Sequence, residues 1–251
     1  MRYTKRLALL LVFLLSIKTG FSQNVVFAQQ IIDTLSSESF HGRGYVNKGD
    51  LLAAKYIAGY YKSFGLDPFD DNYFQDFELD VNTVTNAAVK VNGEELVPGY
   101  DYLVSPSSPT YSGSYKVKKL NHKRLNNGKK KQLSKTIAKG KAPLVNSTLL
   151  SKESNRSLYA ISYKEAPVVK VNKGLTYSVA RNQSEGVQVW LNEESFSRRV
   201  KHIDLSIKSE LIKDYKSQNV IGIVNGTKYP DSLIVICGHY DHLGKMGNAT
   251  F

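Results

Sequence analysis

The sequence lacks the features that define several protein classes. It has a single cysteine, Cys237, among 251 residues, so no disulfide can form within the chain, and a hydrophobic core or a metal must stabilise the fold. After residue 22 no apolar segment approaches the roughly 20 residues that a membrane-spanning helix needs, so we expect no stable membrane insertion. No nucleophile-elbow pattern is present, which argues against a serine hydrolase of that type.

Acidic residues are missing from one long segment. Residues 102–152 contain 12 lysines and arginines and no aspartate or glutamate, and the whole chain has a net charge of +12. The basicity is therefore local and describes one surface rather than the fold. The lysines around Lys129–Lys131 suit an anionic polymer, but aromatic residues are not interleaved with them as stacking platforms. We therefore favour a solvated surface for this Lys-rich stretch and expect no nucleic-acid partner.

The N-terminus has the three-part pattern of a secretory signal peptide. Arg2, Lys5 and Arg6 precede the apolar run Leu7–Ile17, and small residues in Lys18–Ser22 lead to an expected cleavage point before Gln23. An apolar run of about 11 residues is too short to span a bilayer. An N-terminal anchor and a buried core helix are the alternatives. We expect residues 1–22 to be a signal peptide and the mature chain to be exported, periplasmic or extracellular.

Three further segments differ in their patterns. Residues 23–80 are predicted to be helical, because apolar residues recur at helical spacing in 25–35 and 50–64. Leu51, Ala54, Ile57, Ala58 and Tyr61 are expected on one face of the second helix. Gly65 and Pro68 are expected to stop that helix, and residues 73–79 follow as a strand.

Residues 81–204 are predicted to form a β-rich insertion or accessory domain. Short apolar runs at 88–91, 115–117, 167–171 and 187–191 are separated by glycine, asparagine, serine and proline, which is typical of strands and loops. Asn92–Gly93 is a hairpin signal.

Residues 205–251 are predicted to begin an α/β sheet. Strands are expected at 203–207, 219–224 and 232–238. Leu233–Cys237 is apolar on both faces, which is typical of a central strand covered by helices on each side. Ligands of such sheets bind beyond the carboxyl ends of the strands.

The segment His239–His242 follows the carboxyl end of this expected central strand. Residues two apart on an extended chain point the same way, so His239 and Asp241 share a side. A metal-bound imidazole needs its second nitrogen held, usually by a carboxylate. His239 as ligand and Asp241 as the group that orients it satisfy this need, although these four residues alone also suit an ordinary hydrogen-bonded loop.

The chain resembles metallopeptidase family 28, the zinc aminopeptidases with two metal ions. The resemblance is clear over roughly 28–80 and 205–251 and loose between them, where relatives often carry a protease-associated β domain. The matching motifs are Leu35–Gly44, Ala53–Ile57, Gly65–Pro68, Ser217–Gly222, Pro230–Ser232 and Ile234–Gly244.

The resemblance implies a fold, a cofactor and an activity. The fold is an α/β zinc-exopeptidase sheet with helices on both faces, entered here through its first elements. The cofactor is zinc, with two ions in the complete enzyme, and His239 is the first ligand of one of them, with Asp241 behind it. The substrates are peptides that lose their N-terminal residues.

In relatives the remaining metal ligands and the general-base glutamate lie further downstream. We therefore expect a truncated chain, ending at residue 251, to be inactive by itself. The alternatives are a non-catalytic exported module of the same superfamily and a glutaminyl-cyclase-like transferase. The oligomeric state stays open.

Other candidates are weaker. Gly42-Arg43-Gly44 lacks the glycine spacing of a dinucleotide loop and is expected to be a loop between two helices. Cys237 is expected to be a small core residue. His41, His122 and His202 are expected to be surface or structural residues.

Overall fold

A computed structural model describes residues 24–126, 131–152, 165–195 and 199–251. The chain divides into two compact units, residues 1–35 and residues 36–251. The predicted signal peptide, and the lysines at 129 and 130, lie outside the described residues. Among the described residues, no helix combines the length and apolar character needed to cross a membrane.

The first unit contains the helix α2 (Val25–Leu35), at the bounds that the apolar spacing predicts. The side chain of Asn24 caps the N-terminus of this helix, because the Oδ1 of Asn24 accepts a hydrogen bond from the backbone N–H of Phe27 at 2.9 Å. An asparagine at this position satisfies one of the donors that a helix start leaves open.

The second unit opens with helical turns that lead into α3. The turns η1 (Glu38–Arg43) and η2 (Val46–Lys48) precede α3 (Gly49–Ser63), which confirms the predicted helix over 50–64. The chain leaves α3 at Gly65, whose φ of +72° lies in the left-handed region that favours glycine. The fully buried side of α3 is formed by Asp50, Ala53, Ala54 and Ala58, and the larger residues predicted for this face are half-buried.

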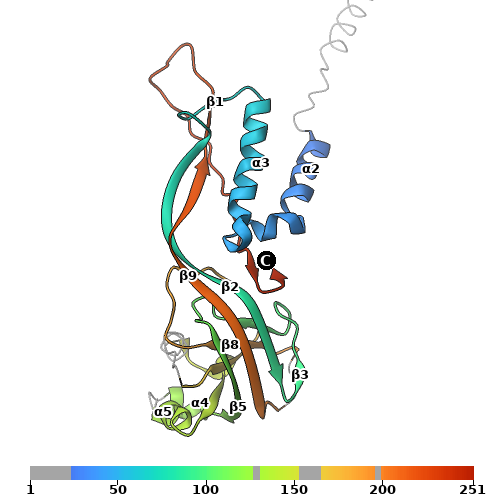
Figure 1. Cartoon of the computed structure of the whole chain (residues 1–251), viewed down its shortest axis with the longest axis vertical. Helices are drawn as coiled ribbons and strands as arrows, with labels where there is room; N and C mark the ends of the chain where they lie inside the picture. Colours follow the sequence, from blue (N-terminus) through green and yellow to red (C-terminus); the bar gives the residue numbers. More distant parts are fainter. Residues whose placement is uncertain (1–23, 127–130, 153–164, 196–198) are drawn as a thin grey trace, which may run out of the picture. The chain divides into compact units, whose positions relative to one another are not determined.

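The rest of the second unit is mostly one mixed sheet (Figure 1). Among the described residues ten strands belong to it, in the order β12-β11-β2-β9-β5-β6-β7-β8-β4, with β3 on β2, and β1 pairs separately with β10. Strands β5 to β8 pair in parallel, whereas β2, β9 and β5 pair antiparallel. The strands are β1 (Asp67–Pro68), β2 (Phe74–Val91), β3 (Glu94–Glu95), β4 (Tyr102–Val104), β5 (Tyr111–Lys119), β6 (Lys141–Asn146), β7 (Val168–Asn172), β8 (Gln188–Asn192), β9 (His202–Val220), β10 (Gly222–Ile223), β11 (Lys245–Met246) and β12 (Ala249–Thr250).

The sheet is held by two apolar clusters. The larger includes Trp190, Tyr102 and Leu103, all essentially buried. The smaller packs the short helices α4 (His122–Asn126) and α5 (Lys131–Ile137) against β6 through Leu125, Leu133 and Val145. The turn η3 (Ser147–Leu149) follows β6. A mixed α/β fold, as predicted, is therefore confirmed.

The pair β2 and β9 is longer than the sequence predicts. The strands expected at 73–79 and 88–91 are one strand, and those expected at 203–207 and 219–224 merge as far as Val220. Figure 1 shows the two as a long twisted pair, and register shifts at Leu79/Val81 and Val84/Asn86 interrupt it. The boundaries predicted at 80 and 204 fall inside these strands, so the division into a peptidase part and an insertion stays a prediction.

The shorter strands of the middle segment match the predicted runs at 115–117, 167–171 and 187–191 in β5, β7 and β8. The hairpin predicted at Asn92–Gly93 joins β2 to β3, and both residues have positive φ, 54° and 89°. These are the angles that a two-residue hairpin turn requires.

The prediction of a central strand at 232–238 is wrong. Residues 233–242 have no regular secondary structure, and Ile234 and Ile236 are 95% and 94% exposed. Cys237 is exposed too, so its assignment to the core is also wrong. The apolar pattern indicates a strand that needs cover on both faces, and in the described residues no neighbouring strand or helix provides that cover.

Candidate functional site

The segment Tyr240–Gly244 lies against the loop Gly42–Gly44. The backbone N–H of His242 donates to the carbonyl of Arg43, and that of Gly244 to the carbonyl of Gly42, both at 3.1 Å. In the other direction the Nε of Arg43 donates to the carbonyl of Tyr240 at 2.9 Å. Two motifs some 200 positions apart in the sequence therefore form one local structure.

Glycines allow the two backbones to approach this closely. A Cβ on Gly44 would lie 2.5 Å from the Cα of Gly244, and one on Gly42 would lie 2.6 Å from the Gly244 carbonyl oxygen. Gly42 also has a φ of +66°. Gly42-Arg43-Gly44, expected as a loop between two helices, instead forms the end of η1, with non-helical angles at Gly42, and its contact with residues 240–244 was not predicted. The signal for it was glycine in both motifs, Gly42 and Gly44 in one and Gly244 in the other.

The first turn of α3 carries a buried carboxylate, that of Asp50, which is 1% exposed. The hydroxyl of Tyr215 donates to its Oδ1 at 2.7 Å and the hydroxyl of Ser217 to its Oδ2 at 2.9 Å. Burial, and then the hydrogen bond to Asp50, raise the pKa of Tyr215 above its ordinary value. Since both carboxylate oxygens are satisfied, Asp50 joins the start of α3 to the end of β9.

Tyr240 ties the candidate segment to the same strand. Its hydroxyl donates to the carbonyl of Gln218, and the amide Nε2 of Gln218 donates back to that hydroxyl at 3.0 Å. Burial is the main cause that raises the pKa of Tyr240. Sequence reasoning assigned no role to Tyr240, Gln218 and Asp50, because their hydrogen bonds join segments that are far apart in the sequence.

His239 and Asp241 lie on the same side of this segment. The Nδ1 of His239 is 3.0 Å from the backbone carbonyl of Asp241 and 3.6 Å from its carboxylate Oδ1. The backbone carbonyl is therefore the nearer acceptor. An imidazole whose Nδ1–H is held by an acceptor keeps the lone pair on Nε2, which is the tautomer that a metal binds. The two side chains are 82% and 56% exposed.

His239 supplies one ligand of a metal site, and the groups around it do not complete the set of ligands. Structural and catalytic zinc sites take at least three protein ligands. Among the described residues, no three side chains of histidine, cysteine, aspartate or glutamate gather closely enough to hold a metal ion. His242 lies in the same segment, but its Nδ1 is 2.8 Å from the carbonyl of Phe251.

The other three histidines have separate surroundings. His202 on β9 contacts Ser114 at 2.7 Å and Asp204 at 3.2 Å. His122 is the first residue of α4. His41 lies in η1 with a φ of 49°, and in the described part of the chain its buried Nδ1 has no hydrogen-bond partner. In the part of the chain that the structure describes, none of them joins the His239 segment in a metal-binding group.

Searches by sequence find no protein-family model and no curated protein that matches the chain. Among solved structures it is similar to a peptidase M28 precursor from Shewanella amazonensis, with a TM-score of 0.50 and 14% identity over 86% of this chain and 57% of that one. It is also similar to BSAP, a zinc aminopeptidase from Bacillus subtilis, with a TM-score of 0.50 and 18% identity over 79% of this chain and 46% of that one.

The fold resembles that of M28 peptidases. The likeness concerns the fold alone, because the identities are 14% and 18%. The chain spans about half the length of the solved structures that it matches.

Proposed function

We propose that this chain is part of an exported zinc aminopeptidase in which His239 binds a zinc ion. The proposal is supported most by one observation: the Nδ1 of His239 is held by Asp241 within a segment that Gly42–Gly44 and Gln218 fix in place. The likeness of the fold to M28 peptidases supports it independently.

In this proposal, residues of the chain orient the imidazole of His239. Asp241 keeps the proton of His239 on Nδ1 and directs Nε2 outward, and Tyr240 and Arg43 hold the backbone on either side of Asp241. When bound, zinc supplies a Lewis acid for the scissile carbonyl of a peptide. Two zinc ions, a bridging carboxylate and a general-base glutamate are part of the proposal, and among the described residues no group of three metal-binding side chains supplies them.

Export is a second part of the proposal. It rests on the charge and apolar pattern of residues 1–22. Mass spectrometry of the mature protein should find an N-terminus at or near Gln23. An exported protein that still begins at Met1 would contradict cleavage.

The test of activity uses the protein isolated from its source, with an amino-acid nitroanilide as substrate and zinc present. We expect turnover that a chelator abolishes and added zinc restores. His239→Ala should remove most of it, whereas Asp241→Asn should have a smaller effect, because the backbone carbonyl of Asp241, the nearer acceptor for the Nδ1 of His239, stays in place. His122→Ala, a histidine change far from this segment in sequence, is the matched control and should leave activity unchanged.

The contrary outcomes separate the alternatives. Chelator-resistant turnover would refute the zinc mechanism. No turnover of any substrate would favour a non-catalytic module, which is the second candidate because the described residues hold no group of three ligands. Ammonia release from N-terminal glutaminyl peptides would favour a glutaminyl-cyclase-like transferase. A polypeptide of residues 23–251 alone should show no chelator-sensitive turnover.

A further inference from the structure

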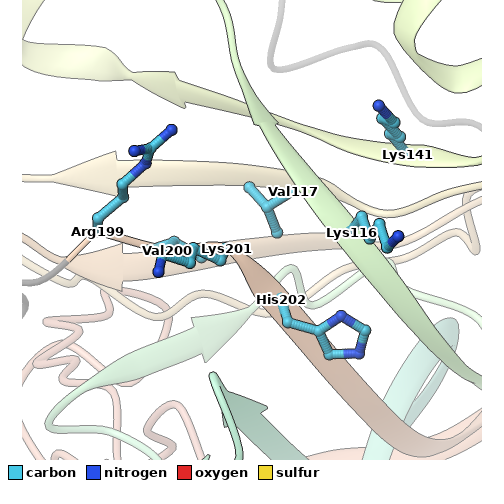
Figure 2. Close-up of a pocket in the computed structure, with 7 residues that line it drawn as sticks. All are labelled: Lys116, Val117, Lys141, Arg199, Val200, Lys201 and His202. Atoms are coloured by element: carbon cyan, nitrogen blue, oxygen red, sulfur yellow. The ribbon is translucent and has the colours of Figure 1, made fainter.

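A basic hollow lies on the sheet where three neighbouring segments meet. Its volume is about 380 Å³, and its lining comes from β5, from the start of β6 and from residues 199–202 leading into β9 (Figure 2). A volume of this size is at the lower end of the range for small-molecule sites. The lining residues are Lys116, Val117, Lys141, Arg199, Val200, Lys201 and His202.

The strand register brings three of the basic side chains to one face. Lys116 on β5 is the register partner of His202 on β9 and of Lys141 on β6. Register partners on neighbouring strands point to the same face of a sheet, about 5 Å apart, and like charges placed directly opposite are destabilising. Lys116 and Lys141, the two lysines of this row, therefore favour an anion between them.

In this row Asp204 pairs with His202, whereas among the described residues no carboxylate forms an ion pair with Lys116 or Lys141. The lining contains four lysine and arginine side chains, and in the described part of the chain none of the four forms an ion pair with a carboxylate. Asp204 is the nearest acid that the geometry identifies, and it is engaged by His202 at 3.2 Å and by the Ser114 hydroxyl at 2.5 Å. The excess of positive charge stays with Lys116, Lys141, Arg199 and Lys201.

The lining also has an apolar part. Val117 and Val200 belong to the lining, with Val117 on the other side of β5 from Lys116 (Figure 2). The backbone N–H of Val117 already donates to the carbonyl of Lys201 at 2.8 Å. Side chains, rather than the Val117 amide, therefore provide the donors for a ligand.

We propose that this hollow binds a small multivalent oxyanion, the phosphate or sulfate group of an ester. Lysine ammonium groups act as point charges for such oxygens, and an arginine guanidinium can engage two of them at once. Only Lys116 and Lys141 come from the Lys-rich stretch, so the rest of that stretch keeps the solvated role predicted for it. The site shares no residue with the His239 segment and stands independently of the proposed peptidase activity.

The test is titration calorimetry of the full chain with inorganic phosphate and, in a second arm, inorganic sulfate, at low and at physiological ionic strength. The double variant Lys116→Gln/Lys141→Gln should weaken binding of the preferred anion at least about 10-fold, since charge-assisted hydrogen bonds are lost. The matched control Lys208→Gln/Lys216→Gln removes two exposed lysines of β9 outside the hollow and should not change it. Salt should weaken binding, because the site is open and screened.

A melting experiment shows whether the variant still folds. Without anion the double variant should melt no lower than the wild type, because it relieves repulsion between Lys116 and its neighbours. With anion only the wild type and the control should gain melting temperature, since a ligand of the folded state stabilises it. The arm that binds more tightly identifies phosphate or sulfate chemistry. Equal affinities in both double variants, or no binding by the wild type in either arm, would overturn the proposal.

Discussion

The Nε of Arg43 donates a hydrogen bond to the backbone carbonyl of Tyr240 at 2.9 Å, across 197 positions of sequence. This bond and two backbone hydrogen bonds beside it attach the candidate metal-ligand segment to the turn before α3. The orientation of His239 thus depends on residues that carry no metal chemistry. Changes in this turn, far from His239 in sequence, are therefore expected to disturb the segment.

Gly44→Ala should loosen the candidate segment. Gly44 has a φ of −112°, which alanine adopts without strain, so the effect is purely steric, with the new Cβ 2.5 Å from the Gly244 Cα. Crowding of this kind costs about 1–3 kcal/mol. Amide hydrogen exchange of His242 and Gly244 should become faster by roughly 10-fold or more, because their partners are Arg43 and Gly42.

Gly59→Ala is the matched control for this change. Gly59 lies inside α3, and a Cβ there would meet nothing within 4 Å. Alanine has a higher helix propensity than glycine, by about 0.8–1 kcal/mol, so this variant should be slightly more stable and should leave both amides protected. Equal exchange in the Gly44 and Gly59 variants would contradict the close contact.

Asp50→Asn should destabilise the fold by about 1–3 kcal/mol. The carboxylate accepts hydrogen bonds from the hydroxyls of both Tyr215 and Ser217, whereas an amide presents one acceptor and an NH₂ group that faces a hydroxyl. The change also removes a negative charge from the first turn of α3, where the helix dipole favours one. Urea denaturation measures the loss, and the exposed Asp76→Asn on β2 is the control that should stay within about 0.5 kcal/mol of the wild type.

A double-mutant cycle separates the Asp50–Tyr215 bond from other effects. Tyr215→Phe leaves one carboxylate oxygen without its donor, so it too should destabilise. If the bond exists, the double variant should lose less than the two single losses together, by about 0.5 kcal/mol or more. Strict additivity would show that the two residues do not interact.

Local patterns predicted the helices, and tertiary contacts explain where strand prediction failed. Residues 25–35 and 50–64 repeat apolar residues at helical spacing and form α2 and α3. In β2 the polar run around Asn82 hid the continuity of the strand. Asn82 is only 4% exposed, and its Nδ2 donates to the carbonyls of Pro106 and Ser108 at 2.7 and 3.0 Å. A buried amide with such partners is compatible with a strand, but the partners are not visible in sequence.

In the candidate site too, contacts between distant segments could not be predicted from local sequence patterns. The type and spacing of His239 and Asp241 predicted that they lie together, and they do, although their assignment as metal ligand and orienting residue stays a prediction. The support from Asp50, Gln218 and Tyr240 depends on hydrogen bonds between distant segments, which no local pattern reports. The prediction of a strand at 232–238 was wrong. An apolar sequence indicates that a strand would need packing on both faces, but it does not show whether neighbouring elements provide that packing.

The segment Leu233–Ile236 should promote self-association. All four side chains are at least 80% exposed, and an uncharged run of β-branched and aliphatic residues is a template for pairing with other chains. Ile234→Glu/Ile236→Glu should lower the aggregated fraction in light scattering and reduce binding of a hydrophobic dye. Val97→Glu changes a single exposed valine elsewhere, 57% exposed, and should alter neither, because scattered apolar residues are ordinary on protein surfaces. Equal effects of both variants would contradict a specific role for the segment.

Lys170 should make the stability of the fold depend on pH above neutrality. Its side chain is 1% exposed on β7, and burial lowers its pKa to about 8 from an ordinary value near 10.4. Below pH 8 both the folded and the unfolded chain hold the proton, and the folded chain bears the cost of burying the charge. Between pH 8 and about 10 the folded chain has released a proton that the unfolded chain still binds, so the free energy of unfolding rises with pH.

The expected rise is about 2 kcal/mol between pH 7 and 9.5. Measurements should stop below pH 10, because burial raises the pKa of Tyr102 and Tyr177 to about 12. Above pH 10 the unfolded chain loses tyrosine protons that the folded chain keeps, and this effect has the opposite sign. Urea titrations at intervals of half a pH unit give the slope. Lys170→Met should flatten it, whereas Lys173→Met, an exposed lysine just beyond β7, should retain it. A slope that survives Lys170→Met would mean that another group titrates in this range.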